Sequence, residues 1–284
     1  MSRRKQPKPL TPETCFGDGQ NVSAFLEQFL GEKPQEAKIL NYRGQLSLFV
    51  EGSGRRYKVS ECESEERAVL AEMAMQAVYE TGGPMPRLYA RSGAVLVTEW
   101  GEGAPCLDEP FERRKSILLQ CQAALCRTPV PENSNPAYVH LETLTRRFRR
   151  LGPRIASRAR IEKVIEHLWS KLPEPESPQV LHPDLTAANI VIGEKGPIII
   201  DNEAMAVGCG VEFDVWNTGE ALCGHRNHDC IHSYADAFSE QFPETRLLSE
   251  EPVWTLFRQF RRMLKAIEKK RFIKALILMN GLSS

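Results

Sequence analysis

Polar side chains able to do chemistry stand between two hydrophobic runs in the second half of the chain. The stretch VLHPDLTAANIVIGEKGPIIIDNE, residues 180–203, contains His182, Asp184, Asn189 and Asp201. Its β-branched runs predict short buried strands, and polar residues at the ends of such strands can converge on a ligand. Carboxylate and amide oxygens can hold a cation or accept a proton. The stretch therefore predicts a functional site rather than a surface loop.

The spacing of these residues fits a kinase catalytic loop. That pattern is H-x-D-L followed by three residues and Asn, and it is matched by HPDLTAAN, residues 182–189. Asp201 follows at the end of the run PIIID, where protein kinases place the metal-binding Asp of their D-F-G, but here the tripeptide is DNE. Gly208 and Asp214 come shortly after, in GCGVEFD. This combination resembles the aminoglycoside phosphotransferase and choline kinase family.

The resemblance implies a role for each residue of the stretch. Phosphoryl transfer passes through a loose transition state, so the protein mainly positions the reactants and offsets charge. Asn189 and Asp201 would hold Mg²⁺ against the phosphates of ATP, because Mg²⁺ takes oxygen ligands. Asp184 would accept or orient the proton of the attacking hydroxyl. His182 would brace the catalytic loop.

The resemblance also implies nucleotide-binding residues in the first hundred positions. Such a fold needs a Lys on the third strand of its small lobe, paired with a Glu on the lobe's helix. Lys58 in RRYKVSE and Glu72 in the helix that follows match these positions. Gly44 in RGQLSLF would let a turn approach the phosphates, and Glu99 and Trp100 in LVTEWGEG resemble the hinge that contacts the nucleotide.

Each of these residues also has a plainer interpretation. Asp184 and Asn189 could cap a turn, since Asp and Asn are common loop residues. Lys58 could be a solvated charge on an edge strand. Glu72 could be an ordinary exposed helix residue, with Glu65 and Glu66 as alternative partners for the Lys.

The element pattern predicts an α+β protein with a two-lobed, protein-kinase-like fold. A small antiparallel sheet with one main helix, N-capped by Ser64, would precede a larger and mostly helical lobe. The last predicted helix runs over residues 253–280 without a break. We expect a mobile tail at 1–18, a nucleotide-binding lobe at 19–100 and a catalytic and substrate-binding lobe at 101–284.

Composition describes an ordinary globular chain. It has 284 residues, 42% hydrophobic content and a formal net charge of zero, so nothing in the overall charge indicates a nucleic-acid partner. There is no apolar run of the roughly 20 residues that crossing a bilayer requires, and no secretory signal, which predicts a cytoplasmic location. Oligomeric state is not predicted. The eight cysteines contain no C-x-x-C pair, so we expect reduced, mostly structural thiols.

One segment, CGHRNHDCIH, collects two Cys, three His and an Asp. On a helix, the side chains of residues 225, 228, 229 and 232 would share a face, which is a spacing suited to a transition metal. The order of ligands matches no zinc module. A polar helix start or a wall of the substrate pocket is the alternative.

The resulting function is an ATP-dependent kinase with Mg²⁺ as metal and a small-molecule hydroxyl as acceptor, such as an aminoglycoside, an amino alcohol or a sugar. Two alternatives stay open. The C-terminal segment is rich in Arg and Lys and could rest weakly on an anionic membrane surface, presenting a lipid or glycolipid hydroxyl to the site. The chain could also be a pseudokinase that binds nucleotide without transferring phosphate.

Overall fold

The computed structural model describes residues 8–42, 45–131, 134, 137–175 and 177–282. The chain divides into two compact units. One comprises the described residues within Met1–Glu109 and Ala187–Ala206, and the other those within Pro110–Thr186 and Val207–Ser284. The predicted lobes, 19–100 and 101–284, are divisions by function and stay a prediction.

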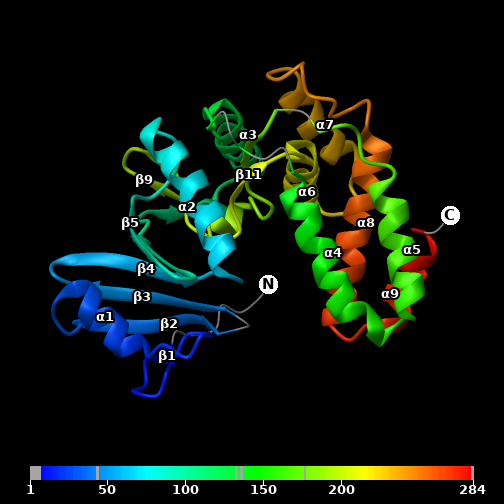
Figure 1. Ribbon diagram of the computed structural model, residues 1–284. Coiled ribbons are helices and arrows are strands. Elements are labelled where there is room, and N and C mark those ends of the chain that lie inside the picture. Colours follow the sequence, from blue (N-terminus) through cyan, green and yellow to red (C-terminus); the bar gives the residue numbers. More distant parts are fainter. Residues whose placement is uncertain (1–7, 43–44, 132–133, 135–136, 176, 283–284) are drawn as a thin grey trace. The chain divides into compact units, whose positions relative to one another are not determined.

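The first unit is built on a six-stranded antiparallel sheet in the order β1-β2-β3-β4-β6-β5 (Figure 1). Its strands are β1 Lys8–Pro9, β2 Glu36–Tyr42, β3 Leu46–Gly52, β4 Arg55–Glu61, β5 Leu88–Ser92 and β6 Val95–Glu99. The strands predicted from alternation and turn residues are found. Lys8 lies opposite Ile39 of β2, so this part of the predicted mobile tail is paired into the sheet.

Alternation along the strands gives the sheet two different faces. Leu48 and Val50 of β3 and Val59 of β4 are buried in one hydrophobic cluster with Phe25 and Leu26 of α1, Val22–Leu30. The opposite face carries Phe49, Lys58 and Thr98, which lie side by side in register on β3, β4 and β6. The hydrophobic face is buried against α1, so only the opposite face can contact a ligand.

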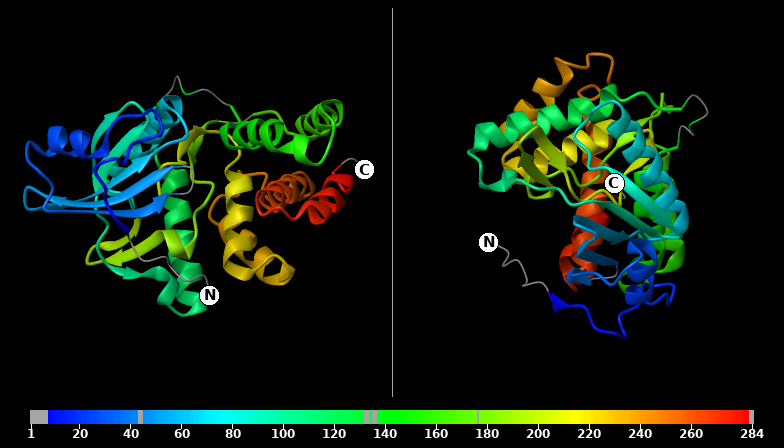
Figure 2. Two further views of the ribbon diagram at one scale, coloured as in Figure 1. Left: turned by 90° about the horizontal axis from the view of Figure 1, so that it is seen from below. Right: turned by 90° about the vertical axis from the view of Figure 1, so that its left-hand side faces the viewer.

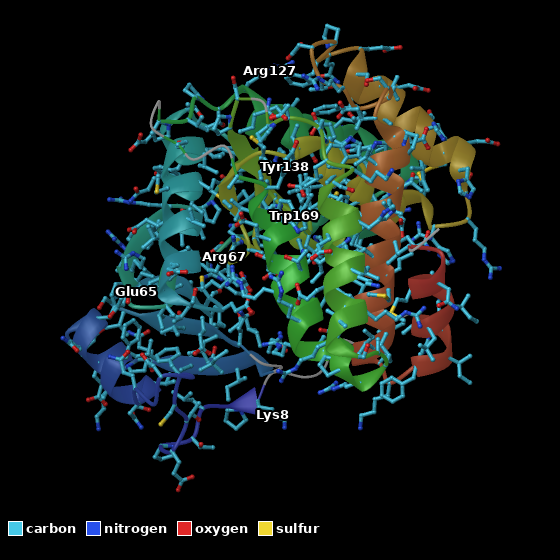
Figure 3. All side chains as sticks on the ribbon, turned by 45° about the vertical axis from the view of Figure 1, so that its right-hand side comes forward. Lys8, Glu65, Arg67, Arg127, Tyr138 and Trp169 are labelled. Atoms are coloured by element: carbon cyan, nitrogen blue, oxygen red, sulfur yellow. A yellow bond between two sulfur atoms is a disulfide. The ribbon has the colours of Figure 1, made fainter. Side chains whose placement is uncertain are left out.

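Helix α2, Glu65–Glu80, begins where the Ser64 hydroxyl accepts a hydrogen bond from the backbone N–H of Arg67 at 3.3 Å, as predicted for an N-cap. The helix contacts β5 and β6. Arg67, labelled with Glu65 in Figure 3, is buried and its guanidinium donates to the carbonyl of Ala204 at 2.8 Å. This bond fixes the segment that follows the predicted site stretch to α2.

A small three-stranded sheet completes the first unit, in the order β10-β9-β7. Its strands are β7 Ala104–Pro105, β9 Ile190–Gly193 and β10 Gly196–Ile199, and the short 3₁₀ turns η1 Cys106–Asp108 and η3 Ala187–Asn189 flank it. Ile190 pairs with Ile199 across the hairpin. The start of β9 and the end of β10 therefore lie next to each other, and the residues that flank these two ends are brought together.

The second unit is mostly helical (Figures 1 and 2). Its elements are α3 Phe111–Arg127, α4 Val139–Leu151, η2 Gly152–Arg154, α5 Arg158–Trp169, α6 Val211–Cys223, α7 His228–Ser239, α8 Glu251–Glu268, α9 Phe272–Asn280 and the paired strands β8 Gln179–Leu181 and β11 Ala206–Gly208. Aromatic rings fill the interior. Phe148 of α4 meets Phe260 of α8 edge to face at 5.3 Å between ring centroids, a geometry that aromatic pairs favour.

The predicted helix over 253–280 is wrong in one respect, because it breaks between α8 and α9. Lys270 adopts a left-handed conformation, with φ of 56°. The N–H of Lys270 donates to the carbonyl of Ile267 at 2.9 Å, and the N–H of Arg271 to that of Ala266 at 2.8 Å. These two bonds form a Schellman motif, which usually has Gly at the left-handed position. The missing Gly is why the break was not predicted.

None of the described helices combines the length and the apolar composition that crossing a bilayer requires.

Candidate active site

Lys58 projects from the polar face of the sheet into a cluster of oxygen atoms. Its Nζ donates to the carbonyl of Ile200 and to Oδ1 of Asp201, both at 2.7 Å, and to Oε2 of Glu203 at 3.2 Å. The side chain is 12% exposed, and β4 lies between β3 and β6. The interpretation of Lys58 as a solvated edge charge is therefore wrong.

The charges around Lys58 are strongly coupled. Burial alone would lower the pKa of Lys58, but the nearby carboxylates of Glu203 and Asp201 outweigh it and raise that pKa above its usual value. Burial also raises the pKa of Glu203, and the like charge of Asp201 adds to the rise, while Lys58 opposes it. One ammonium thus pairs with two carboxylates, which leaves one negative charge that a further cation could neutralise.

The predicted ion pair between Lys58 and Glu72 is not the one that forms. Glu72, on α2, accepts a hydrogen bond from Nε of Arg91 at 2.6 Å, and Arg91 also lies 3.6 Å from Glu65. Arg91 is on β5, which packs against α2, so the two carboxylates on the helix have a cation closer to them than Lys58. Glu203 stands in the place that was assigned to Glu72.

Asn189 and Asp201 flank the β9–β10 hairpin. Asn189 immediately precedes β9, Asp201 follows Ile200 after β10, and the N–H of Ile200 donates to the carbonyl of Asn189 at 2.9 Å. The hairpin geometry explains why two residues 12 positions apart face one cavity. The tripeptide DNE was noted as a departure from D-F-G, but Glu203 was given no role, although its place two residues after the strand-terminal Asp could have suggested one.

These side chains open on one cavity within the first unit, with a volume of about 230 Å³. It is lined by Leu40, Asn41, Ser47, Lys58, Pro86, Glu99, Trp100, Gly101, Asn189, Ile200, Asp201 and Glu203. Glu99 and Trp100 were predicted as hinge residues, and both lie on its wall. Gly44 lies outside the described residues.

The wall near Trp100 is fixed by packing and by a glycine. The Trp100 ring meets Phe49 edge to face, with centroids 4.9 Å apart, and its backbone N–H donates to the carbonyl of Arg56 at 3.0 Å. A Cβ added to Gly101 would lie 2.5 Å from Cγ2 of Ile200, closer than carbon atoms can approach. Glycine at this position therefore lets the segment after Trp100 pack directly against the side chain of Ile200.

The donor set of the cavity fits Mg²⁺. Asn189 contributes an amide oxygen, and Asp201 and Glu203 contribute carboxylates, which are the hard oxygen ligands that this ion prefers. The ammonium of Lys58 already lies within hydrogen-bond distance of both carboxylates, which shows that the cluster accommodates positive charge.

His182 and Asp184 belong to the second unit, where Asp214 holds the loop that carries them. Asp214, in the first turn of α6, is fully buried; its Oδ2 accepts from the backbone N–H of His182 at 2.9 Å, and its Oδ1 lies 3.1 Å from Nδ1 of His140. His182 is buried as well. The position of Asp214 at the helix N-terminus suits its carboxylate.

Asp184 has a partner that the sequence did not suggest. Its side chain is 54% exposed, and its Oδ1 accepts from the guanidinium of Arg261, on α8, at 2.9 Å. The same guanidinium donates to the carbonyl of Pro183 at 3.3 Å and to Oδ1 of Asn217 at 3.1 Å. Arg261 therefore holds the carboxylate of Asp184 at the surface of its unit, where a substrate hydroxyl could reach it.

The family model described as "Phosphotransferase enzyme family" matches residues 44–248, well over half of the chain. The chain belongs to this family. The match confirms the resemblance stated from the catalytic stretch, and with it an ATP-dependent phosphotransferase that has an alcohol group as acceptor. Among curated protein sequences, none matches this phosphotransferase significantly.

Solved structures confirm the two-lobed, protein-kinase-like α+β fold of this phosphotransferase. A thermostable mutant of aminoglycoside phosphotransferase APH(4)-Ia, in ternary complex with ADP and hygromycin B, is 13% identical, with a TM-score of 0.58 over 92% of this chain and 96% of that one. Ethanolamine kinase from Plasmodium vivax is 14% identical, with a TM-score of 0.61 over 87% of this chain and 82% of that one. At these identities the likeness concerns the fold alone.

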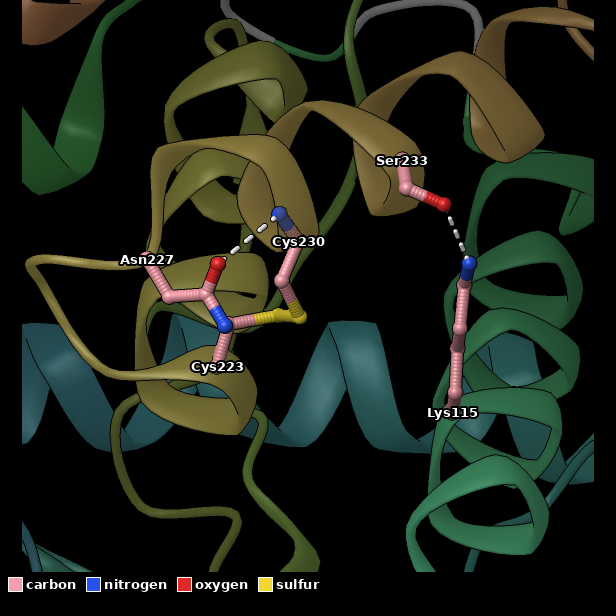
Figure 4. Close-up of a disulfide and its surroundings, with 5 residues drawn as sticks. All are labelled: Lys115, Cys223, Asn227, Cys230 and Ser233. Carbon is pink, nitrogen blue, oxygen red and sulfur yellow. Dashed lines mark hydrogen bonds between the residues drawn. A yellow bond between two sulfur atoms is a disulfide. The ribbon is translucent and has the colours of Figure 1, made fainter.

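The expectation that all thiols are reduced is wrong at one place in this phosphotransferase. Cys223, at the end of α6, and Cys230, in the first turn of α7, form a disulfide (Figure 4). Beside it, the Asn227 side chain accepts from the N–H of Cys230 at 3.3 Å and caps α7. The turn through residues 224–227 brings the two thiols together, which spacing alone did not reveal.

The disulfide bears on the metal site considered for this segment. Helix α7 begins at His228, so His225 does not share its face. Across the described part of the chain, no three His, Cys, Asp or Glu side chains are grouped so as to hold a metal ion. A polar helix start describes the segment better.

Proposed function

We propose that this phosphotransferase moves the γ-phosphoryl group of ATP to a hydroxyl of a small molecule, with an aminoglycoside, an amino alcohol or a sugar as the acceptor classes. The observation that carries the proposal is the convergence of Lys58, Asn189, Asp201 and Glu203 on one cavity beside Trp100. A cation beside phosphates, oxygen ligands for a metal and an aromatic wall for a base are the parts that an ATP site needs.

In this assignment each side chain has a task in nucleotide binding. Lys58 contacts the phosphates and offsets their charge, and Glu203, rather than Glu72, keeps its ammonium in place. The segment at Glu99 and Trp100 borders the base. Asn189 and Asp201, with Glu203 beside them, are the residues that would hold Mg²⁺, whose charge would offset that of the β- and γ-phosphates.

Asp184 is the residue we assign to the acceptor. Its carboxylate accepts or orients the proton of the attacking hydroxyl, which makes the oxygen a better nucleophile as the new bond forms. His182 braces the loop through its backbone bond to Asp214. Because ATP is the phosphoryl donor, we propose that the enzyme works in the cytoplasm.

The structure accounts for only some of the basic residues behind the membrane alternative. Of the basic residues in the C-terminal segment, Arg261 pairs with Asp184 and Arg262 pairs with Glu220 at 3.1 Å, while Arg258 is buried. The other basic residues of the segment are exposed, so weak membrane contact stays an alternative; they are Lys265, Lys269, Lys270, Arg271 and Lys274.

The decisive experiment measures nucleotide binding and turnover separately. Binding of Mg·ATP to the folded state should stabilise it by about 2.7 kcal/mol at a hundredfold excess over Kd. Asp201→Ala should lose this stabilisation, and Asp229→Ala, an exposed carboxylate on α7, should keep it. Unchanged stabilisation of Asp201→Ala would show that the metal assignment is wrong.

Release of ADP in the presence of hydroxyl-bearing acceptors then separates the kinase from the pseudokinase. Turnover that needs both Mg²⁺ and an acceptor supports the kinase. Nucleotide binding without turnover on a panel of aminoglycosides, amino alcohols, neutral sugars, sugar acids and sugar phosphates supports the pseudokinase.

A further inference from the structure

Four cationic residues of α8 lie on one side of the helix. Arg258, Arg261, Arg262 and Lys265 are spaced by three, four and seven positions from the first, which places them on one face. This face meets α6 and the loop that carries Asp184. The second unit therefore gathers positive charge around the residue that we assign to the acceptor hydroxyl.

Two of these cations share a single carboxylate. Glu220, on α6, lies 3.1 Å from Arg262 and 3.9 Å from Arg258. Arg258 is buried and its guanidinium carbon lies 4.9 Å from the centroid of the Trp216 ring. Glu220 thus balances one of the two charges, and the ring offsets part of the desolvation of the other.

The remaining two cations stand beside Asp184. Arg261 takes up the carboxylate of Asp184 and is itself 19% exposed, so this ion pair is open to solvent. Lys265 lies one helical turn further along the same face and is exposed. Within the described part of the chain, the ammonium of Lys265 makes no hydrogen bond or ion pair. Partial burial and the charge of Arg261 lower the pKa of Lys265, while Asp184 opposes this.

The local charges do not cancel. The cluster has four cations, Arg258, Arg261, Arg262 and Lys265, against three carboxylates, Asp184, Glu220 and Glu251, which leaves an excess of one positive charge. Arg147, which also acts on Lys265, is paired with Glu268 and adds no net charge. Such a field attracts anions and repels polycations.

We propose that the acceptor of this phosphotransferase carries a carboxylate or a phosphate besides its hydroxyl, and that Arg261 and Lys265 bind this anionic group. The inference rests on the proposed function. In the transfer, the acceptor oxygen bonds to the γ-phosphorus, the bond from that phosphorus to the ADP oxygen breaks, ADP leaves, and the hydroxyl proton passes to Asp184. The guanidinium of Arg261 can contact both Asp184 and the acceptor, since it presents five donors in a planar fork.

The test compares sugars that differ mainly in charge. Glucuronate, glucose 6-phosphate, glucose and glucosamine are added at equal ionic strength to the full chain saturated with Mg·AMP-PNP, and the melting temperature is measured. We expect the increase in melting temperature to be several-fold larger with the two anionic sugars than with glucose, and smallest with glucosamine. The two anions also distinguish a carboxylate from a phosphate as the recognised group.

Charge reversal supplies the matched comparison. Lys265→Glu should abolish the preference for the anionic sugars, whereas Lys269→Glu, the same change at an exposed position after the end of α8, should keep it. Equal effects of all four sugars, a preference for glucosamine, or an unchanged preference in Lys265→Glu would each overturn the inference. Stabilisation by Mg·AMP-PNP alone tests the proposed function, and an absence of stabilisation would contradict that function. Stabilisation by Mg·AMP-PNP without a preference for anionic sugars would contradict only this inference.

Discussion

At the scale of single residues, Asp184 is where binding and catalysis can be separated. A carboxylate that acts on the attacking hydroxyl contributes to the transition state and little to nucleotide affinity. Asp184→Asn should therefore lower kcat by roughly 10² to 10⁴-fold with ATP affinity near that of the wild type. Turnover, ATP affinity and thermal unfolding are measured on Asp184→Asn and Asp184→Ala. Full activity in Asp184→Asn, with lost stability in Asp184→Ala, would mean that this residue only braces the loop.

Glu203 and Glu72 offer a matched pair of carboxylates for testing which one holds Lys58. Glu203→Gln removes a charge within hydrogen-bond distance of the ammonium and should weaken Mg·ATP binding, seen as a higher KM and less thermal stabilisation. Glu72→Gln breaks a solvent-accessible pair with Arg91, which contributes little to stability, so thermal unfolding and KM should both stay close to those of the wild type. The reverse pattern would restore Glu72 to the role that the sequence suggested.

The pKa of Lys58 determines how the stabilisation from its ion pairs with Asp201 and Glu203 depends on pH. Its pKa is raised in the folded protein, so the stabilisation from its ion pairs is complete below its ordinary value of 10.5 and is lost as pH rises through the folded pKa. Between pH 7 and about 10, titration of Lys58 should therefore leave the KM of the wild type for ATP unchanged, which steady-state kinetics across this range would measure.

At this scale, the sequence predicted the site residues that lie close together in the chain but not the ion pairs between distant elements. Asn189 and Asp201 were assigned from their resemblance to the kinase pattern, whose spacing is short because the two residues flank one hairpin. Arg91 and Arg261 lie on elements far along the chain from their partners, 19 residues from Glu72 and 77 from Asp184. Pairs of this kind depend on how the elements pack, which no local pattern contains.

At the scale of elements, the break between α8 and α9 depends on a lysine in a conformation that costs an L-residue about 1 to 2 kcal/mol. Lys270→Gly should remove this cost against a smaller loss of backbone entropy, raising the free energy of unfolding by about 0.5 to 1 kcal/mol. Lys269→Gly, at a position with φ of −79°, is the control and should destabilise by a similar amount. Denaturant unfolding measures both, and destabilisation by both variants would contradict the Schellman assignment.

The disulfide that links α6 and α7 can be tested by counting reactive thiols. Two of the eight cysteines form the disulfide and the other six are thiols, so denatured protein without reductant should show six reactive thiols and reduced protein eight. Because the bridge closes a short loop, its reduction should lower stability by about 2 kcal/mol. Eight reactive thiols without reductant would show that Cys223 and Cys230 are not joined.

At the scale of the whole molecule, the chain contributes to the first unit twice. Strands and helices up to Glu109 supply Lys58, Glu99 and Trp100 to the cavity, and Ala187–Ala206 supplies Asn189, Asp201 and Glu203. The order of strands before helices predicted the fold class, because each element type was readable locally. The sequence did not predict that the β9–β10 hairpin belongs to the first unit. Its strand β9 pairs with β7 across more than eighty intervening residues of helix and loop.

This arrangement predicts where nucleotide should slow hydrogen exchange. The proposed ATP cavity lies within the first unit, so Mg·ATP should reduce local opening of Trp100, Gly101 and the β9–β10 hairpin. Amides of α5 and α9, in the second unit, that exchange through local opening should change little, since only those that need global unfolding share the added stability. Mass-spectrometric exchange with and without Mg·ATP measures this, with Asp201→Ala as the variant that should show no protection. Uniform slowing in both units, with none concentrated at the hairpin, would place the nucleotide elsewhere.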